Sequence, residues 1–595
     1  MLAHAKTPVT LSPLKPRRIR PRSGTQKSYQ AIDTLIMDFK RYSLIAAIAI
    51  LSYLLLIEWS QFSAEKKQTQ PTTVQQANAL APTEPAETID TTAIPLEPAS
   101  AENIPSTVET HELKAIANNA STIAVETDSL IVNIDLLGGD ITYAALPRHF
   151  AAIDTPDKPF VLLENNQQRT YIAQSGLIGK NGTDTNKGRP LFSSEQQQYR
   201  LEETADSLTV SLYHRSDNNV QIRKDFIFKR GSYVIDVNYV IDNQSSEMWS
   251  AGMFGQLKRD NTVDPGAESS GMGMAPYLGA AFTLVDEPYK KVAFDKFQEK
   301  PFNNKREGGW CAIVQHYFLS AWIPNKEATN VFTTLKTANG DNLVRFTSTA
   351  INIEAGQQGS INAQFYAGPK DQYSLQEISP GLELSVDYGF LWLPAQGLFW
   401  LLTKIHAFFG NWGVAIIGVT LLVKIAFFQL NTKAYTSMAN MRKVQPKLLE
   451  IRERHADDKA KQSQAMMKLY KDEKINPLGG CLPILVQMPI FISLYWVLME
   501  SVELRHAPFM LWIDDLAAMD PYFILPLIMG ASMFIQQKLN PPPPDPMQAK
   551  VMQWMPVMFT FFFLFFPSGL VLYWVVNNVL SIAQQYIITK RIENA

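Results

Sequence analysis

Six apolar segments constrain the fold of this 595-residue chain more than any other feature, and five of them crowd into its C-terminal third. A bilayer core needs about 20 mostly apolar residues per helix, and flanking aromatic or basic side chains can lengthen a shorter run. The predicted transmembrane segments are 44–59, 413–430, 482–499, 522–537, 551–566 and 569–588. The sequence therefore predicts a membrane protein with an α-helical bundle of six transmembrane helices.

The basic residues of the short loops predict the orientation of these helices. Loop 431–480 is rich in lysine and arginine, whereas loop 500–521 carries only Arg505 and loop 567–568 carries no charge. Because lysine and arginine gather on the cytoplasmic side, loop 431–480 and both chain ends are predicted to be cytoplasmic.

Lys424 lies inside the predicted helix 413–430. A lysine at the centre of a bilayer helix costs about 2.5–3.5 kcal/mol and usually faces a bundle interior or a watery cavity. It could also extend along the helix to the membrane surface, since only six residues separate it from Leu430. Thr420 precedes it by four residues, so both side chains share one helix face.

Residues 120–385 have a different pattern from the helical part. Apolar and polar residues alternate in Ser129–Leu136 and Leu208–Tyr213, and Val220–Phe228 and Tyr233–Ile241 flank a turn sequence that predicts a hairpin. Further strands are predicted at 330–335, 343–348 and 359–367. We interpret this segment as a large β-sandwich domain outside the membrane.

The remaining segments connect these parts. Residues 1–43 are predicted to be a basic cytoplasmic tail, although translation could start at Met37; a native N-terminus at Leu2 or Ala3 would disprove that start. Segment 44–59 is predicted to be an uncleaved anchor and 60–119 a disordered linker, because few large apolar residues occur there. Segment 386–411 is predicted to be a helix lying in the membrane interface.

The cytoplasmic loop 431–480 is predicted to form a helical hairpin. Met441, Val444, Leu448 and Ile451 follow a helical spacing, and Pro446 suits the first turn of a helix. A second helix is predicted at 459–474. The alternative is a charged loop without regular structure.

Several functional classes find no support in the sequence. Cys311 and Cys481 are predicted on opposite sides of the membrane, so neither a disulfide nor a cysteine-based metal site is expected. We find no phosphate-binding loop, no HExxH and no GxSxG, and no nucleic-acid-binding module follows the basic tail. The chain is therefore predicted to be neither an enzyme nor a cofactor-binding protein, with no direct nucleic-acid substrate.

A multi-span chain with an external β-domain could serve one of three general functions. A secondary transporter would show internal repeats, which the sequence lacks. A sugar-active enzyme with a membrane anchor would need paired acid and base groups, and the domain offers only single histidines such as His214 and His316. A structural scaffold remains the third possibility.

Several sequence motifs resemble those of one protein family. They are YTSMANMRKVQPKL (435–448), NPLGGCLPILVQMPIF (476–491), APFMLWIDDL (507–516), DPYFILPLIMG (520–530) and FPSGLVLYWVVNN (566–578). The chain resembles the YidC/Oxa/Alb family of membrane protein insertases, in its six-span bacterial form. The resemblance implies that the β-domain is a periplasmic supersandwich. It also implies that the chain inserts new proteins into the bacterial inner membrane and helps them fold, alone or with the Sec translocon.

The resemblance also implies a polar groove among the conserved spans. The family's basic groove residue matches Lys424, where relatives of this type usually carry arginine. Lysine keeps the charge but loses the two-pronged guanidinium. Tyr573 and Trp574 match an aromatic pair that meets the passing helix. The predicted groove residues are Lys424, Thr420, Gln487, Ser493, Tyr573, Trp574, Asn577 and Ser581.

The implied partners are nascent membrane proteins, the Sec translocon, membrane lipids and a ribosome or targeting factor. The basic cytoplasmic hairpin is expected to meet the ribosome or targeting factor. Its predicted contact residues are Arg442, Lys443, Arg452 and Arg454.

Overall fold

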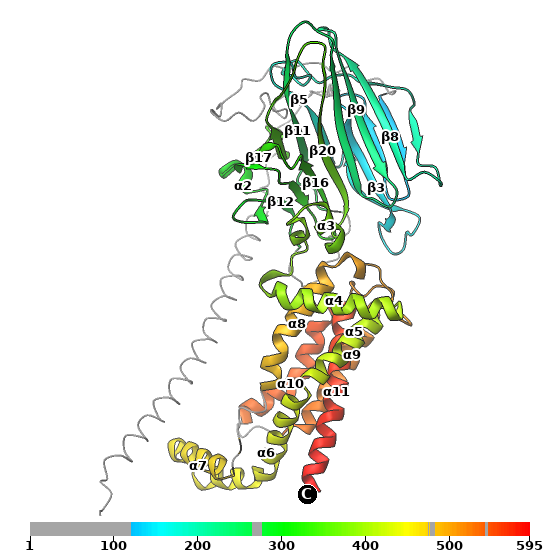
Figure 1. Cartoon of the computed structure of the whole chain (residues 1–595). Helices are drawn as coiled ribbons and strands as arrows, with labels where there is room; N and C mark the ends of the chain where they lie inside the picture. The colour runs from blue at the N-terminus through cyan, green and yellow to red at the C-terminus, as the bar shows by residue number, and fades with distance from the viewer. Residues whose placement is uncertain (1–120, 265–275, 474, 476–481, 542–545, 595) are drawn as a thin grey trace, which may run out of the picture. The chain divides into compact units, whose positions relative to one another are not determined.

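The computed structural model describes residues 121–264, 276–473, 475, 482–541 and 546–594. The predicted tail 1–43, anchor 44–59 and linker 60–119 lie outside the described residues. All described residues belong to one compact unit, Ala86–Ala595. Within this unit, the chain first forms a β-rich domain and then a helical part (Figure 1).

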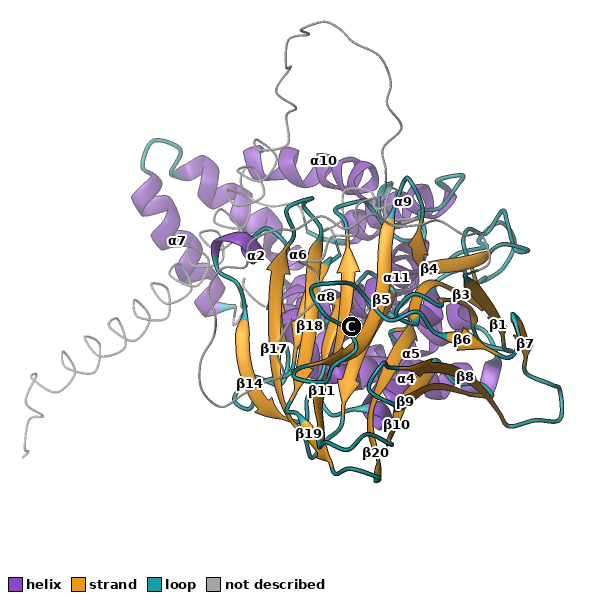
Figure 2. Ribbon diagram, turned by 90° about the horizontal axis from the view of Figure 1, so that it is seen from above, coloured by secondary structure: helices purple, strands orange, loops and turns teal. Residues whose placement is uncertain are grey.

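The β-rich domain consists of two sheets. In chain order the 11-stranded sheet contains β1 (Thr122–Glu126), β2 (Ile131–Asp135), β3 (Asp140–Phe150), β4 (Pro159–Asn165), β5 (Thr170–Ile178), β7 (Gln198–Arg200), β11 (Trp249–Arg259), β14 (Asn303–Glu307), β17 (Thr329–Lys336), β18 (Asn342–Ser348) and β19 (Ile351–Ile353). The nine-stranded sheet contains β6 (Ser193–Ser194), β8 (Ser207–Arg215), β9 (Val220–Lys229), β10 (Val234–Asn243), β12 (Gly279–Phe282), β13 (Lys290–Val292), β15 (Cys311–Val314), β16 (Phe318–Pro324) and β20 (Gln358–Pro369). Figure 2 shows β14, β17, β18, β11 and β5 side by side, in the order of their hydrogen bonding.

Alternation of side chains explains why these segments are strands. In β10 every second residue is buried, as expected where one face of a sheet packs on a core. The β9 and β10 strands pair antiparallel with Phe228 opposite Ile235, which confirms the predicted hairpin. Gly231 in its turn has φ +73°, a conformation that glycine adopts without steric penalty.

The core of the domain is shared by both sheets. Trp322 of β16, in the smaller sheet, packs 6.2 Å from the ring of Phe346 of β18, in the larger sheet. The indole nitrogen of Trp322 also donates to the carbonyl of Gln256 in β11, so its polar atom is satisfied inside the core. Both sheets are thereby joined into one β-rich domain.

The helical part begins after this domain. The short helices are α2 (Lys296–Glu299), α3 (Gln372–Ile378), η3 (Leu382–Ser385), η4 (Gly389–Leu391) and η6 (Val502–Leu504). The longer helices are α4 (Trp392–Phe409), α5 (Trp412–Ala426), α6 (Phe428–Arg454), α7 (Lys459–Asp472), α8 (Leu482–Glu500), α9 (Ile524–Leu539), α10 (Pro546–Phe563) and α11 (Ser568–Glu593). The α11 helix packs against α5, α6 and α9. A second buried apolar cluster is formed by residues of α4, α5, α8, α9, α10 and α11 and of the loops between them.

By length and composition, fewer helices qualify as membrane spans than the six that the sequence predicts. Within the described residues no single helix is both long and apolar enough to cross a membrane by those two criteria. The bent pair α5 and α6 meets them together, and 485–500 and 524–539 form shorter apolar helices.

Pro446 does not begin a helix, which corrects the prediction made from its position. It lies inside α6, which runs on from Phe428 to Arg454. A proline in a helix interior removes one hydrogen bond, and the 27-residue helix tolerates this loss. The α7 helix packs against α6 because its Met466, Leu469 and Tyr470 lie against a buried cluster of Val444, Leu448 and Ile475.

The β-rich domain contacts the end of α8 and the loop that follows it. Lys370, which follows β20, pairs with Glu500 at 2.8 Å, and both side chains are buried. His316 Nε2 hydrogen-bonds the carbonyl of Met499 at 2.7 Å. Arg505 donates to the carbonyl of Ala151 at 3.0 Å. These polar contacts join residues that are far apart in the sequence.

The stability of this region is expected to fall below neutral pH. Burial lowers the pKa of His316 to about 4, and burial with the nearby Arg505 charge does the same for His149 and His506. Between pH 6.5 and 4 the unfolded chain therefore binds more protons than the folded chain, so the unfolding free energy decreases as the pH falls. Each fully shifted histidine adds a slope of up to about 1.4 kcal/mol per pH unit.

Melting temperatures of the purified chain from pH 7 to pH 4.5 measure this loss. The His316→Gln variant keeps an amide donor for Met499 but cannot titrate, so its melting temperature should depend less on pH. An unchanged pH dependence in this variant would contradict the assignment.

Candidate functional site

The predicted helix 413–430 is divided in two in the structure. The α5 helix ends at Ala426, α6 begins at Phe428, and the two axes differ by 68° (Figure 1). Composition alone predicted one helix because the apolar run continues through the break. Lys424 consequently lies in the last turn of α5, where a cation also meets the helix dipole favourably.

Lys424 faces a neighbouring helix. Its side chain is 7% exposed, and its Nζ donates to the Ser581 hydroxyl of α11 at 2.7 Å. Ser581 in turn donates to the carbonyl of Asn577 at 2.7 Å. Thr420 is also buried, but its hydroxyl donates to the Ile416 carbonyl of its own helix. Among the described residues no carboxylate pairs with Lys424, and its ammonium group donates to the Ser581 hydroxyl.

Other polar side chains of α11, on both sides of Ser581 in the sequence, also contact neighbouring helices. Asn578 donates to Ser532 of α9 at 3.0 Å, and Gln585 donates to Asn540 at 2.8 Å. Gln584 donates at 3.2 Å to both the Phe428 carbonyl and the Thr432 hydroxyl of α6. The α11 helix therefore carries a polar stripe that reaches α5, α6 and α9.

The aromatic pair Tyr573 and Trp574 lies at the other end of this stripe. Tyr573 is buried, and Trp574 is half-buried beside Phe491 of α8, whose ring is 4.8 Å away and nearly perpendicular. Phe563 of α10 lies 5.2 Å from the Trp574 ring. The Trp574 Nε1 is shielded from solvent, and no hydrogen-bond acceptor for it lies within the described part of the chain. The pair thus packs where α8, α10 and α11 meet.

Gln487 and Ser493 of α8 are less closely connected to Lys424. Ser493 is fully buried, and its hydroxyl donates to the carbonyl of Pro489 in its own helix at 2.7 Å. This is the back-bond to the carbonyl four residues earlier that a serine hydroxyl commonly makes inside a helix. Gln487 is half-buried. The structure thus brings the side chains of Lys424 and Ser581 together, and Asn577 joins them only through its backbone carbonyl. Thr420 and Ser493 bond to their own helices.

Two polar side chains of α6 escaped the sequence analysis. Asn431 is fully buried, and Tyr435 is buried and interacts with the Ser581 side chain. Both follow the break, in a region that the sequence assigned to the start of a cytoplasmic loop. The helical spacing of 431 and 435 with Phe428 would have placed them on one face, had α6 been predicted to start at 428.

The basic residues of α6 are largely on the surface. Arg442, Lys443 and Arg454 are exposed, and Arg454 pairs with Glu450 at 2.6 Å. Arg452 is half-buried, and its carbonyl accepts a hydrogen bond from Gln462 of α7.

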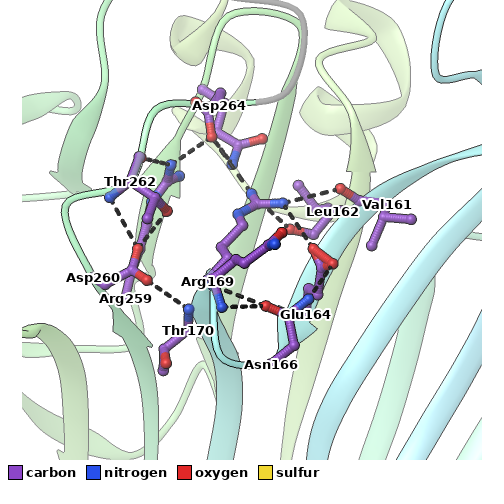
Figure 3. Close-up of polar contacts among 12 residues, drawn as sticks. Val161, Leu162, Glu164, Asn166, Arg169, Thr170, Arg259, Asp260, Thr262 and Asp264 are labelled. Carbon is purple, nitrogen blue, oxygen red and sulfur yellow. Dashed lines mark hydrogen bonds and ion pairs between the residues drawn. The ribbon is translucent and has the colours of Figure 1, made fainter.

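The β-rich domain also holds buried charges. Arg169 and Arg259 both approach Asp264 (Figure 3). The guanidinium groups of both arginines also lie over the ring of Tyr171. Arg169 also donates to the carbonyls of Val161 and Leu162. These groups are held by backbone carbonyls and by an aromatic ring, an arrangement that stabilises packing.

A second buried cluster surrounds Lys224. Its Nζ donates to the carbonyls of Gly138, Gly139 and Ser175 at 2.7–3.3 Å, and burial lowers its pKa to about 7. Neither cluster pairs a carboxylate with a histidine. Within the described part of the chain, no group of three histidine, cysteine or carboxylate side chains is placed to hold a metal ion.

The chain thus combines a β-rich domain with a following helical part in which Lys424 faces a neighbouring helix. Residues 122–401 match a family model described as the YidC periplasmic domain, and residues 404–595 match one described as the 60Kd inner membrane protein. The chain belongs to the YidC family of membrane protein insertases. The membrane protein insertase YidC of Cellvibrio japonicus is 52% identical over 560 residues, covering 94% of this chain and 99% of the relative. That of Ectopseudomonas mendocina is 50% identical over 584 residues, with the same coverage.

Solved structures resemble the chain more distantly. A crystal structure of an active YidC insertase with its first transmembrane domain resolved is 19% identical, with a TM-score of 0.37, covering 79% of this chain and 93% of that one. A galactose mutarotase related enzyme from Lactobacillus acidophilus is 11% identical, with a TM-score of 0.28, over 41% of this chain and 97% of that one. Scores this low support no argument about function.

Proposed function

We propose that this chain inserts newly made proteins into the bacterial inner membrane and helps them fold, through a polar groove between its helices. The observation that carries the proposal is the inward position of Lys424. Its Nζ reaches Ser581 of α11 and has no carboxylate partner among the described residues. This burial favours a groove residue over one that extends to the membrane surface. The relatives' name, membrane protein insertase, supports the same function.

The groove would act by attraction and hydration. Lys424 would attract acidic residues of the segment to be moved, and the pull is stronger where the local dielectric is low. Its hydrogen bond to Ser581 requires only one donor of the ammonium group, so two donors remain for water or substrate. A lysine lacks the two-pronged clamp of arginine, so the proposed role needs no fixed geometry at the carboxylate.

Insertion would need no bond to be made or broken, so we propose that the chain is not an enzyme. Moving the apolar span of the substrate from the groove into lipid would drive its release, at about 25 cal/mol per Å² of apolar surface buried. The groove would shorten the path of the polar segment through hydrocarbon.

We further propose six spans with both termini in the cytoplasm and the β-rich domain in the periplasm. The α4 helix would lie in the outer membrane interface. It presents large exposed apolar side chains, including Trp392, Trp400 and Phe408, which suit the boundary between headgroups and hydrocarbon.

The α6 and α7 helices would form a cytoplasmic hairpin. The exposed side chains of Arg442, Lys443 and Arg454, with Arg452 beside them, would meet a ribosome or targeting factor. Nascent membrane proteins would be the substrates, and the Sec translocon and membrane lipids further partners.

Rescue of cells depleted of their own insertase tests the function, and crosslinking tests the site. A photoreactive phenylalanine analogue in place of Trp574 should crosslink to a stalled nascent membrane protein. The matched control is Val579, which is on the same helix but 52% exposed. A chain that fails to rescue growth, or that crosslinks equally from both positions, would contradict the proposal.

A further inference from the structure

Asn431 is a buried polar residue without a partner. It lies one turn into α6, just after the break, and its side chain is 0% exposed. Among the residues that the structure describes, neither its side-chain nitrogen nor its side-chain oxygen has a hydrogen-bond partner. Its backbone N–H is satisfied by the Phe427 carbonyl at 2.9 Å, so only the side chain is left unpaired.

Its position follows from helical spacing. Residues three and four apart share one face of a helix, so Asn431 lies on the same face of α6 as Phe428 and Tyr435. This face meets α11, because Gln584 donates to the Phe428 carbonyl and Tyr435 interacts with Ser581. Asn431 therefore lies on the α6 face that adjoins the Lys424–Ser581 contact.

An unsatisfied amide in this position is unfavourable for folding alone. A buried polar group without a partner carries its full desolvation penalty, and an apolar residue of the same shape would avoid it. A side chain that weakens the fold at such a place is better explained by a partner that arrives from outside the chain.

We propose that Asn431 binds the backbone amide groups of the segment in transit. A side-chain amide has two donors and one acceptor oxygen, so it matches the N–H and C=O of a peptide unit of any sequence. Lys424, by contrast, attracts acidic side chains. This inference rests on the proposed function and adds a contact that does not depend on substrate charge.

Two test substrates distinguish the proposed role of Asn431 from that of Lys424. Both are single-span proteins of equal length, one with an acidic outer tail and one with a neutral polar tail. Asn431→Leu keeps the volume and removes the amide, so insertion of both substrates should slow about three- to tenfold, the effect of one lost hydrogen bond. Its melting temperature should be unchanged or higher. Lys424→Ala should slow only the acidic substrate.

Two further variants complete the experiment. Asn431→Gln keeps an amide and should insert both substrates at close to the rate of the unmodified chain. Thr436→Val is the matched control on α6, because the Thr436 hydroxyl donates to the Thr432 carbonyl of its own helix. It should insert both substrates normally.

The outcomes distinguish this inference from the function it rests on. Normal insertion by Asn431→Leu, with a defect in Lys424→Ala, would overturn the role of Asn431 and leave the proposed groove standing. A lower melting temperature in Asn431→Leu with a matching loss of insertion would also overturn it, since the residue would then be structural. Normal insertion by both variants would overturn the proposed groove as well.

Discussion

Lys424→Glu is expected to abolish insertion of single-span proteins with acidic outer tails. The variant places a carboxylate where an acidic segment would pass, so attraction becomes repulsion. Two unit charges 4 Å apart interact by about 4 kcal/mol at an effective dielectric constant of 20, so the reversal is worth several kcal/mol. Each 1.4 kcal/mol changes a rate about tenfold, so insertion should fall by at least 100-fold. Protease protection of the tail in insertase-depleted cells measures this loss.

Matched variants isolate the charge from the shape. Lys424→Arg keeps the charge and should retain insertion. Lys424→Met keeps the length of the side chain without the charge and should give an intermediate rate. A substrate with a basic tail should not suffer from Lys424→Glu as an acidic one does. Normal insertion of the acidic substrate by Lys424→Glu, with the variant present at the usual level, would show that the groove does not work by charge.

The strands were predictable because their signal is local. In β10 the alternation of apolar and polar residues shows directly as alternating burial, and the β9–β10 turn contains a glycine in the left-handed conformation that such a turn uses. These features depend only on neighbouring residues. The order of strands within the two sheets depends on contacts such as those of β11 with β5 and β18, which no local pattern encodes.

The helical site was predictable in part. Lys424 stands out because a charge in an apolar run is expensive wherever it lies. Its partner Ser581, 157 residues further on, could be suggested only as one polar residue among several. The break after Ala426 was missed because Phe427 and Phe428 continue the apolar run and no proline or glycine marks it. Missing the break also hid Asn431, which then counted as part of a loop.

The contacts between the β-rich domain and α8 could not be read from the sequence. Lys370 and Glu500 are 130 residues apart, and each is an ordinary charged residue in its local context. Only the folded chain shows that they are buried together. Substituting one member of such a pair should have a large effect on stability, because the other charge is then buried without its partner.

Lys370→Met is therefore expected to destabilise the chain by roughly 3–5 kcal/mol, the usual effect of breaking a buried ion pair. Lys370 and Glu500 are 3% and 8% exposed, and Lys370 also donates to the Ser385 carbonyl at 3.3 Å. A cavity of about 210 Å³ beside them, lined by both side chains and by Trp496, offers Glu500 no cation that is closer than Lys370. Unfolding of the purified chain in detergent, followed by tryptophan fluorescence, measures the loss.

The double variant Lys370→Met with Glu500→Leu should recover most of this stability, because no buried charge is then left alone. The exposed pair Lys290–Glu287, at 3.1 Å, is the matched control, and Lys290→Met should change the unfolding free energy by less than about 1 kcal/mol. Equal effects of Lys370→Met and Lys290→Met would mean that water reaches the Lys370–Glu500 pair. The contact would then hold the β-rich domain to α8 no more firmly than a surface ion pair. A large coupling between Lys370 and Glu500 would instead make α8 the helix whose outer end is fixed, so that α5, α6 and α11 are left to adjust around a passing segment.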